Sequence, residues 1–195
     1  MRPLTLLLLA LSACAAPSTR PREASSRKTV LGRSVEGRPL ELRTFGTGSD
    51  TVLLVATIHG NESAGTPLLE RLAERLESDP ELLRNRRVLL VTVANPDGLA
   101  RRTRGNARGV DLNRNFPTTN RKDTRRFGTA LSEPESSALH RLIGVCRPSR
   151  VVSLHEPRAC VDYDGPAEAL ARAMSAACGL PVEKLGSRPG SLGSY

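Results

Sequence analysis

The chain has 195 residues, of which 25% are charged and 38% hydrophobic, so it can form one globular domain but not two of ordinary size. Its 29 basic and 20 acidic residues leave a net charge of +9, which by itself would suit a polyanionic partner. The positive charge is local, because residues 1–28 carry +4 and residues 101–126 carry +7, leaving −2 for the rest. With no Trp, two Tyr and three Phe, the chain offers few rings on which bases could stack, and we expect no nucleic-acid partner.

The N-terminus has the pattern of a targeting segment. Arg2 precedes an apolar run, Leu4–Leu11, that as a helix would span roughly 12 Å against a bilayer core of about 30 Å. This run is too short for a stable membrane span. It ends in Leu11-Ser12-Ala13-Cys14, which resembles the bacterial lipobox, where cleavage precedes a Cys that becomes lipid-modified. A plain secretory signal with an incidental Cys is the alternative.

We therefore divide the chain into a lipoprotein-type signal peptide (1–13), a lipid-anchored flexible tether (14–28) and a folded domain (29–195). The tether is rich in Pro, Ser and Arg. Lipid on Cys14 would hold the protein on a membrane, so we expect the bacterial cell envelope, at its periplasmic or outer-membrane face. Cys146, Cys160 and Cys178 can form at most one disulfide, and without a CxxC pair they predict no zinc–thiolate site.

Predicted strands and helices alternate along the domain. Strands are expected in two short stretches of residues 29–43 around the Glu36-Gly37 turn, and at 51–58, 88–94 and 150–154, with the second long strand closed by residues 95–98. One helix is expected to begin after a cap at Thr66. A second is expected to begin at residues 132–135, which have capping-box spacing, and to end at about residue 145. A third is expected over residues 166–178, where Gly179 stops it. Alternation of this kind predicts an α/β domain with a largely parallel sheet covered on both faces.

Three polar residues follow directly on two of these predicted strands. His59 and Glu62 come after the first long strand, and His155 comes after the strand at 150–154. Reactive groups of such sheets collect beyond the carboxyl ends of the strands. Two imidazoles and one carboxylate are a common catalytic zinc set that leaves a position open for water. From the residues alone, hydrogen-bonded loop residues are an equally weighted alternative.

Six segments, taken in chain order, resemble the zinc metallocarboxypeptidases of the carboxypeptidase A type, most of all their bacterial murein peptide amidase branch. They are GRSVEGRPL (32–40), H-x-x-E (59–62), NPDG (95–98), RGNARGVDLNRNFP (104–117), SEPES (132–136) and the isolated His155. The resemblance implies a mixed, mostly parallel carboxypeptidase-like sheet and a Zn²⁺ cofactor held by His59, Glu62 and His155. It also implies that Arg104 polarises the scissile carbonyl and stabilises the oxyanion.

The same resemblance implies that Asn113 and Arg114 hold the carboxylate of the substrate, for which a guanidinium fork is suited. The other arginines of residues 101–126 are expected to form a solvated face. His140 lies within a predicted helix and is expected to be a surface or packing residue.

One part of the family pattern is missing. The general base of the family is a Glu on a later strand, beyond a Gly-Ser segment that resembles residues 190–195, where this chain stops. The tyrosine that often precedes that segment is not evident either, and Glu156 and Glu183 do not match the position of the base. We expect a fragment truncated at its C-terminus, the alternative being a shortened protein with impaired catalysis.

The sequence thus predicts a zinc-dependent metallopeptidase or amidase acting on a peptide substrate derived from peptidoglycan, with no protein partner predicted. The first alternative is an N-acyl amino acid deacylase of the aspartoacylase or succinylglutamate desuccinylase type, which shares HGNE and DLNR. The second is a non-catalytic envelope lipoprotein that binds peptide or zinc.

Overall fold

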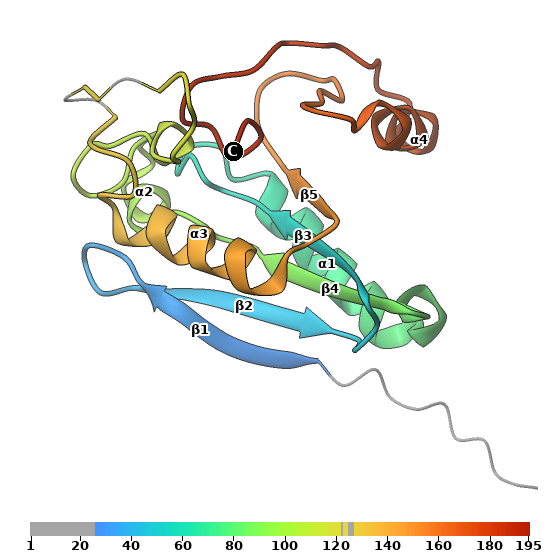
Figure 1. The fold of residues 1–195 in the computed structure, drawn as a ribbon. Coiled ribbons are helices and arrows are strands. Elements are labelled where there is room, and N and C mark those ends of the chain that lie inside the picture. Colours follow the sequence, from blue (N-terminus) through green and yellow to red (C-terminus); the bar gives the residue numbers. More distant parts are fainter. Residues whose placement is uncertain (1–25, 122, 125–126) are drawn as a thin grey trace, which may run out of the picture.

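A computed structural model describes residues 26–121, 123–124 and 127–195, so the predicted signal peptide and Cys14 lie outside the described residues (Figure 1). One five-stranded sheet has the strand order β1-β2-β4-β3-β5. Its strands are β1 (Arg27–Arg33), β2 (Pro39–Phe45), β3 (Asp50–Val55), β4 (Arg86–Val91) and β5 (Arg150–Ser153). The α-helices are α1 (Gly65–Ser78), α2 (Pro96–Arg101), α3 (Pro134–Cys146) and α4 (Glu168–Cys178), with 3-10 turns η1 (Pro80–Leu83) and η2 (Leu112–Arg114).

The sheet is mixed, as predicted. Strand β3 pairs in parallel with β4 and β5, whereas β2 pairs antiparallel with β1 and β4. Four of the five strands therefore point the same way and only β2 runs against them. Strand β1 begins at Arg27, so Arg27 and Lys28, predicted in the tether, belong to the sheet, where they pair with Thr44 and Arg43.

Helices cover both faces of this sheet (Figure 1). Alternate residues of a strand point to opposite faces. On one face the core contains Leu53 and Val55 of β3 with Leu139 and Leu142 of α3. On the other face Val88 and Leu90 of β4 pack with Ala73 and Leu76 of α1, while Leu54 of β3 packs against this cluster. Two apolar layers therefore fix the sheet from both sides.

The predicted strands end earlier than their apolar runs. Strand β3 stops at Val55 because Thr57 takes a left-handed conformation with φ of 52°. Strand β4 stops at Val91, and residues 95–98 begin a helix instead of only closing the strand. Asn95 caps this helix, since its side chain accepts a hydrogen bond from the Gly98 amide at 2.9 Å.

Two predicted helix caps are wrong. Thr66 lies inside α1, where its hydroxyl donates to the Thr92 carbonyl at 2.8 Å instead of capping the helix. Ser132 does not close a capping box, because its hydroxyl donates to the Glu133 carboxylate at 2.9 Å and Glu133 is the residue before the helix. The partner of Thr66 is a tertiary one, whereas that of Ser132 is the next residue in the chain. Helix α4 begins at Glu168, two residues later than predicted, and ends at Gly179, which has φ of 75°.

The segment from α4 to the C-terminus returns to the carboxyl edge of the sheet, where its end lies beside the loops (Figure 1). The Phe116 amide donates to the Gly190 carbonyl at 3.0 Å, and the Gly190 amide donates to Thr118 Oγ1 at 2.7 Å. Within the described ranges, none of the helices has both the length and the apolar character needed to cross a membrane.

Candidate metal centre

The carboxyl ends of β3 and β5 bring the three predicted metal ligands together. These strands are parallel neighbours, and Val55 is in register with Ser153. His59 and Glu62 lie in the loop after β3, and His155 is two residues beyond the end of β5. Parallel neighbouring strands end at one edge of the sheet, so residues more than 90 positions apart in the sequence meet there.

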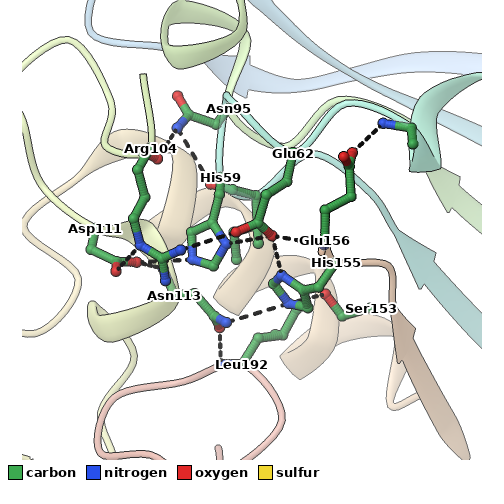
Figure 2. A network of polar contacts seen from close by, with 12 residues as sticks. His59, Glu62, Asn95, Arg104, Asp111, Asn113, Ser153, His155, Glu156 and Leu192 are labelled. Atoms are coloured by element: carbon green, nitrogen blue, oxygen red, sulfur yellow. Dashed lines mark hydrogen bonds and ion pairs between the residues drawn. The ribbon is translucent and has the colours of Figure 1, made fainter. Parts of the chain in front are cut away.

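The two imidazoles face the same carboxylate oxygen (Figure 2). Glu62 Oε2 lies 2.8 Å from His59 Nδ1 and 2.9 Å from His155 Nδ1. One ligand atom from each residue falls within a group whose members are at most 4.8 Å apart. The side chains of His59 and Glu62 are buried, at 4% and 9% exposed, while that of His155 is 35% exposed. The cluster is therefore open to solvent on the side of His155.

The arrangement fits a metal ion because a buried nitrogen without a hydrogen bond lies beside further metal-binding groups. His59 Nδ1 is buried and makes no hydrogen bond among the described residues, although Glu62 Oε2 is only 2.8 Å away. The distance is right for a hydrogen bond, but the direction is not. Arg43 Nε and His140 Nδ1 are also buried without a hydrogen bond, and His59 Nδ1 differs from them in lying within a group of three candidate ligands. Two imidazole nitrogens and a carboxylate oxygen are also a donor set that zinc prefers.

Electrostatics keep the carboxylates of the cluster ionised. Burial alone would raise the pKa of Glu62. The hydrogen bond from His155 and the adjacent His59 outweigh this effect, and the pKa of Glu62 lies well below its usual range. Burial would likewise lower the pKa of His59, but the neighbouring carboxylates of Asp111 and Glu62 raise it. A carboxylate that stays ionised is the form that binds a cation.

Asp111 is a residue of the centre that the sequence analysis did not single out. Its Oδ1 lies 3.2 Å from His59 Nε2, and its Oδ2 accepts a hydrogen bond from Arg104 Nε at 2.9 Å (Figure 2). A carboxylate at Nε2 favours a proton there and leaves Nδ1 for a metal. Despite burial, the pKa of Asp111 is lowered to about 2 by the hydrogen bond with His59 and the charges of His59 and Arg104. In the sequence, Asp111 is marked only by its position in the segment 104–117, two residues before the predicted substrate-binding residue Asn113.

Arg104, predicted to act on the scissile carbonyl, lies at the cluster. Its Nη1 donates to Glu62 Oε1 at 3.0 Å, and its side chain is 39% exposed. The Glu62 carboxylate therefore turns one oxygen to the two imidazoles and the other to Arg104. This places a cation beside the candidate metal site with part of its surface open to solvent.

The two predicted carboxylate-binding residues lie on η2, and Asn113 is close to His155. Asn113 Nδ2 is 3.4 Å from His155 Nε2, and Asn113 Oδ1 accepts a hydrogen bond from the Leu192 amide at 2.8 Å. The Arg114 guanidinium donates to the Asn113 carbonyl. Asn113 is therefore placed beside a candidate metal ligand and also tied to the C-terminal segment.

A close approach of two backbones shapes the loop that carries His59. The Gly60 amide donates to the Arg104 carbonyl at 3.3 Å. A Cβ atom at Gly60 would lie 2.0 Å from the carbonyl carbon of Gly98, on α2. Only glycine fits here, because the three nearest atoms, from Gly98 and Leu99, all belong to the backbone and cannot rotate away.

Other candidate groups are directed elsewhere. The Glu156 carboxylate points away from the cluster and accepts a hydrogen bond from the Ala64 amide at 2.6 Å (Figure 2). Glu183 lies 3.8 Å from Arg158. Neither carboxylate faces the two imidazoles. His140, expected to be a packing residue, packs against Tyr195, with ring centroids 5.1 Å apart.

Comparison with known proteins identifies the family of this chain. Residues 20–164 match the family described as zinc carboxypeptidase, and the chain therefore belongs to the zinc carboxypeptidase family. Murein peptide amidase A of Escherichia coli strain K12 is 37% identical over 184 residues, an alignment that covers 84% of this chain and 74% of the relative. The family predicted from the six motifs is confirmed, and the family match favours a peptidase over the deacylase alternative.

Solved structures give the same fold. The structure of murein-tripeptide amidase MpaA from Escherichia coli O157 superposes with a TM-score of 0.70 and 32% identity, covering 86% of this chain and 76% of that one. Carboxypeptidase A from Helicoverpa armigera, at 21% identity, has a TM-score of 0.74 and covers 89% and 56% respectively. The second likeness concerns the fold alone. The predicted carboxypeptidase-like α/β fold is confirmed.

Proposed function

We propose that this chain is a zinc-dependent amidase that hydrolyses a peptide amide bond in murein peptides, with zinc held by His59, Glu62 and His155. The observation that carries the proposal is the convergence of both imidazole Nδ1 atoms on Glu62 Oε2, at 2.8 and 2.9 Å. Three protein ligands are the usual number in catalytic zinc sites, which keep one position for water. The murein substrate is supported by the names of the related amidases.

When bound, zinc lowers the pKa of water to about 7 and polarises a carbonyl. The residues of the chain supply the remaining functions. Asp111 orients the His59 ring through Nε2. Arg104 provides a fixed cation where negative charge develops on the carbonyl oxygen. Asn113, beside His155, and Arg114 bind the carboxylate of the substrate, which sets the peptide against the metal site.

Metal content tests the ligand set directly. Purified protein is expected to contain about one zinc per chain, and His59→Ala is expected to lose it, because two ligands rarely retain zinc against a chelator. His140→Ala is the matched control, since His140 packs against Tyr195 and is expected to keep the metal. Stoichiometric zinc in His59→Ala would exclude this ligand set.

Substrate preference tests the reaction. In protein extended at its C-terminus to include the general-base Glu of the family pattern, we expect release of an amino acid or diamino acid from murein peptides, measured by chromatography, with N-acetyl and N-succinyl amino acids supplied as competitors. Faster hydrolysis of the simple N-acyl compounds would favour the deacylase alternative. If this extended protein binds zinc and cleaves neither class, a binding lipoprotein would be favoured.

We also propose that the protein is anchored in the bacterial envelope through lipid on Cys14, which rests on the sequence of residues 1–28 alone. Wild-type protein made in bacteria is expected to enter the detergent phase on phase separation, whereas Cys14→Ser enters the aqueous phase or stays uncleaved. Equal partitioning of both, with a mature N-terminus at another residue, would instead indicate a plain secretory signal.

A further inference from the structure

A buried polar cluster lies behind the candidate metal centre and uses motif residues that the metal ligands leave unexplained. Its central residue is Asn106 of the RGNARG segment, which is 2% exposed. The neighbouring acids are Glu133 and Glu135 of the SEPES segment, at 3% and 0% exposed. Buried groups of this kind are costly unless every partner is present, so the contacts of Asn106 indicate what the cluster does.

Both polar atoms of the Asn106 side chain are used. Its Nδ2 donates to Glu133 Oε2 at 2.7 Å and to Glu135 Oε2 at 3.2 Å. Its Oδ1 accepts from the amides of Arg108 at 3.0 Å and Val110 at 3.2 Å. The Asn106 amide also donates to the Val110 carbonyl at 3.0 Å. The side chain therefore closes the turn of residues 106–110 and ties it to the start of α3.

The acids that hold Asn106 are themselves fixed. Glu135 is in the first turn of α3, and its Oε1 accepts from the Val35 amide at 3.3 Å, in the turn between β1 and β2. Glu133 accepts a hydrogen bond from the Ser132 hydroxyl at 2.9 Å. Carboxylates are also favoured at the N-terminus of a helix, where amides are unpaired. Asn106 is thus attached to a helix that packs in the core.

The turn held by Asn106 leads directly into the metal centre. Asp111 follows Val110 and contacts His59 Nε2, while Arg104 precedes Asn106 by two residues and contacts Glu62. A shift of this turn would move the Asp111 carboxylate away from the His59 ring. Removing a residue that orients a metal ligand commonly weakens metal affinity by 10- to 100-fold. We expect the removal of the Asn106 side chain to weaken zinc affinity by roughly an amount in this range.

We propose that Asn106 is a positioning residue for the metal centre, which acts by holding Asp111 against His59. The inference rests on the proposed zinc site, but it concerns metal affinity and does not depend on the substrate. A carboxamide is required, because the side chain has to donate to two carboxylates and accept from two amides. Aspartate would place a third negative charge between Glu133 and Glu135.

The test is zinc affinity, measured by competition with a chromogenic chelator. Asn106→Ala is expected to bind zinc about tenfold more weakly than wild type. Asn115→Ala is the matched control, since Asn115 is also buried and contacts the start of α3, but its Nδ2 closes a different loop through the carbonyls of Phe127 and Thr129. This control is expected to unfold at a lower temperature and to keep wild-type zinc affinity.

A double-mutant cycle with Asp111→Asn identifies the route of the effect. If Asn106 acts through Asp111, Asn106→Ala is expected to weaken zinc binding by less than twofold once Asp111 has been changed, because the effects of coupled residues do not add. If the fold losses of zinc affinity in the two single variants multiply in the double variant, the two residues act independently and the proposal is overturned. Wild-type affinity in Asn106→Ala, or an equal loss in Asn115→Ala, would also overturn it.

Two further results separate the possible failures. If Asn106→Ala does not fold, as judged by circular dichroism, Glu135→Leu removes one carboxylate acceptor of Asn106 with a side chain of similar volume, and unchanged zinc affinity in that variant would overturn the proposal. If wild-type protein itself binds no zinc, the proposed metal centre fails. If wild type binds zinc and Asn106→Ala binds it equally well, only the positioning role fails.

Discussion

At the scale of residues, the candidate site depends on how one carboxylate divides its contacts. Glu62 Oε2 faces the Nδ1 atoms of His59 and His155 and accepts from the Glu156 amide at 3.2 Å, while Oε1 accepts from Arg104. The hydrogen bond from His155 and the adjacent His59 hold Glu62 ionised. One ligand atom from each imidazole and from the carboxylate lie within 4.8 Å of one another, so the three residues are close enough to share one cation.

Asp111 makes the stability of the metal-free protein depend on pH. Its pKa is lowered from 3.8 to about 2 in the folded chain, so its contribution is present above the unfolded pKa and is lost as the pH falls toward 2. We expect Asp111→Asn to lower the free energy of unfolding by about 2 kcal/mol at neutral pH, and the gap to narrow to roughly half by about pH 3. Urea unfolding in chelator measures this gap. A gap that stays constant with pH would contradict the prediction.

Arg114 and Arg104 are expected to affect different kinetic constants. The planar fork of Arg114 can bind both oxygens of a carboxylate, which the point charge of Lys does not reproduce, so Arg114→Lys is expected to raise KM about tenfold. Arg104 is proposed to act where charge develops on the carbonyl oxygen, and on that proposal Arg104→Ala is expected to lower kcat about 10²-fold. Steady-state assays on murein peptides measure both. Equal changes of KM and kcat in the two variants would exclude this division of roles.

At the scale of elements, the site depends on loops that are held close to rigid secondary structure. The end of β3 and the start of α2 approach so closely that Gly60 contacts the Gly98 backbone. The loop of residues 104–111 is tied to the start of α3 by Asn106. Functional side chains on loops are therefore positioned by elements that belong to the core.

Two glycine substitutions test this close approach. Gly60→Ala would place its Cβ 2.0 Å from the Gly98 carbonyl carbon, and we expect a loss of stability of about 2 kcal/mol or more together with weaker zinc binding. Gly144→Ala is the control in α3, where a Cβ meets no atom within 4 Å and helix propensity predicts a gain of about 0.5–1 kcal/mol. Thermal unfolding and zinc titration compare them. Equal stability of the two variants would contradict the prediction, because it would mean that the backbones at Gly60 and Gly98 can move apart to make room for a Cβ.

At the scale of the whole molecule, the metal centre joins segments that are distant in sequence. The candidate ligands come from the loops after β3 and β5, and three of their partners, Arg104, Asp111 and Asn113, come from residues 104–113. A ligand that binds only the folded arrangement stabilises the entire fold by mass action. Zinc is therefore expected to stabilise the domain as a unit.

Zinc-dependent thermal unfolding measures this coupling. With free zinc at about 100 times its Kd, the expected gain is about 2.7 kcal/mol, which corresponds to a rise in Tm of roughly 5–10 °C for a domain of this size. His59→Ala is expected to show no zinc-dependent rise. A rise of the same size in this variant would place the stabilising metal elsewhere on the protein.

The sequence by itself determined the elements with strong local patterns and the three candidate ligands. Apolar runs predicted β3, β4 and β5, and the positions of His59, Glu62 and His155 at strand ends predicted their convergence. These features follow from hydrophobic periodicity and from the rule that parallel strands place their carboxyl ends together.

Only the tertiary structure decided where hydroxyl, carboxylate and carboxamide groups find their partners. Thr66 and Ser132 have cap-forming side chains, yet the Thr66 hydroxyl donates to the Thr92 carbonyl and the Ser132 hydroxyl accepts from Asn115 Nδ2. The pairing of Asp111 with His59 crosses 52 positions of sequence. Side-chain hydrogen bonds have no period along the chain, because they depend on the distance between elements after the core has packed. The convergence of the candidate metal ligands could therefore be predicted from sequence, whereas the groups that orient them could not.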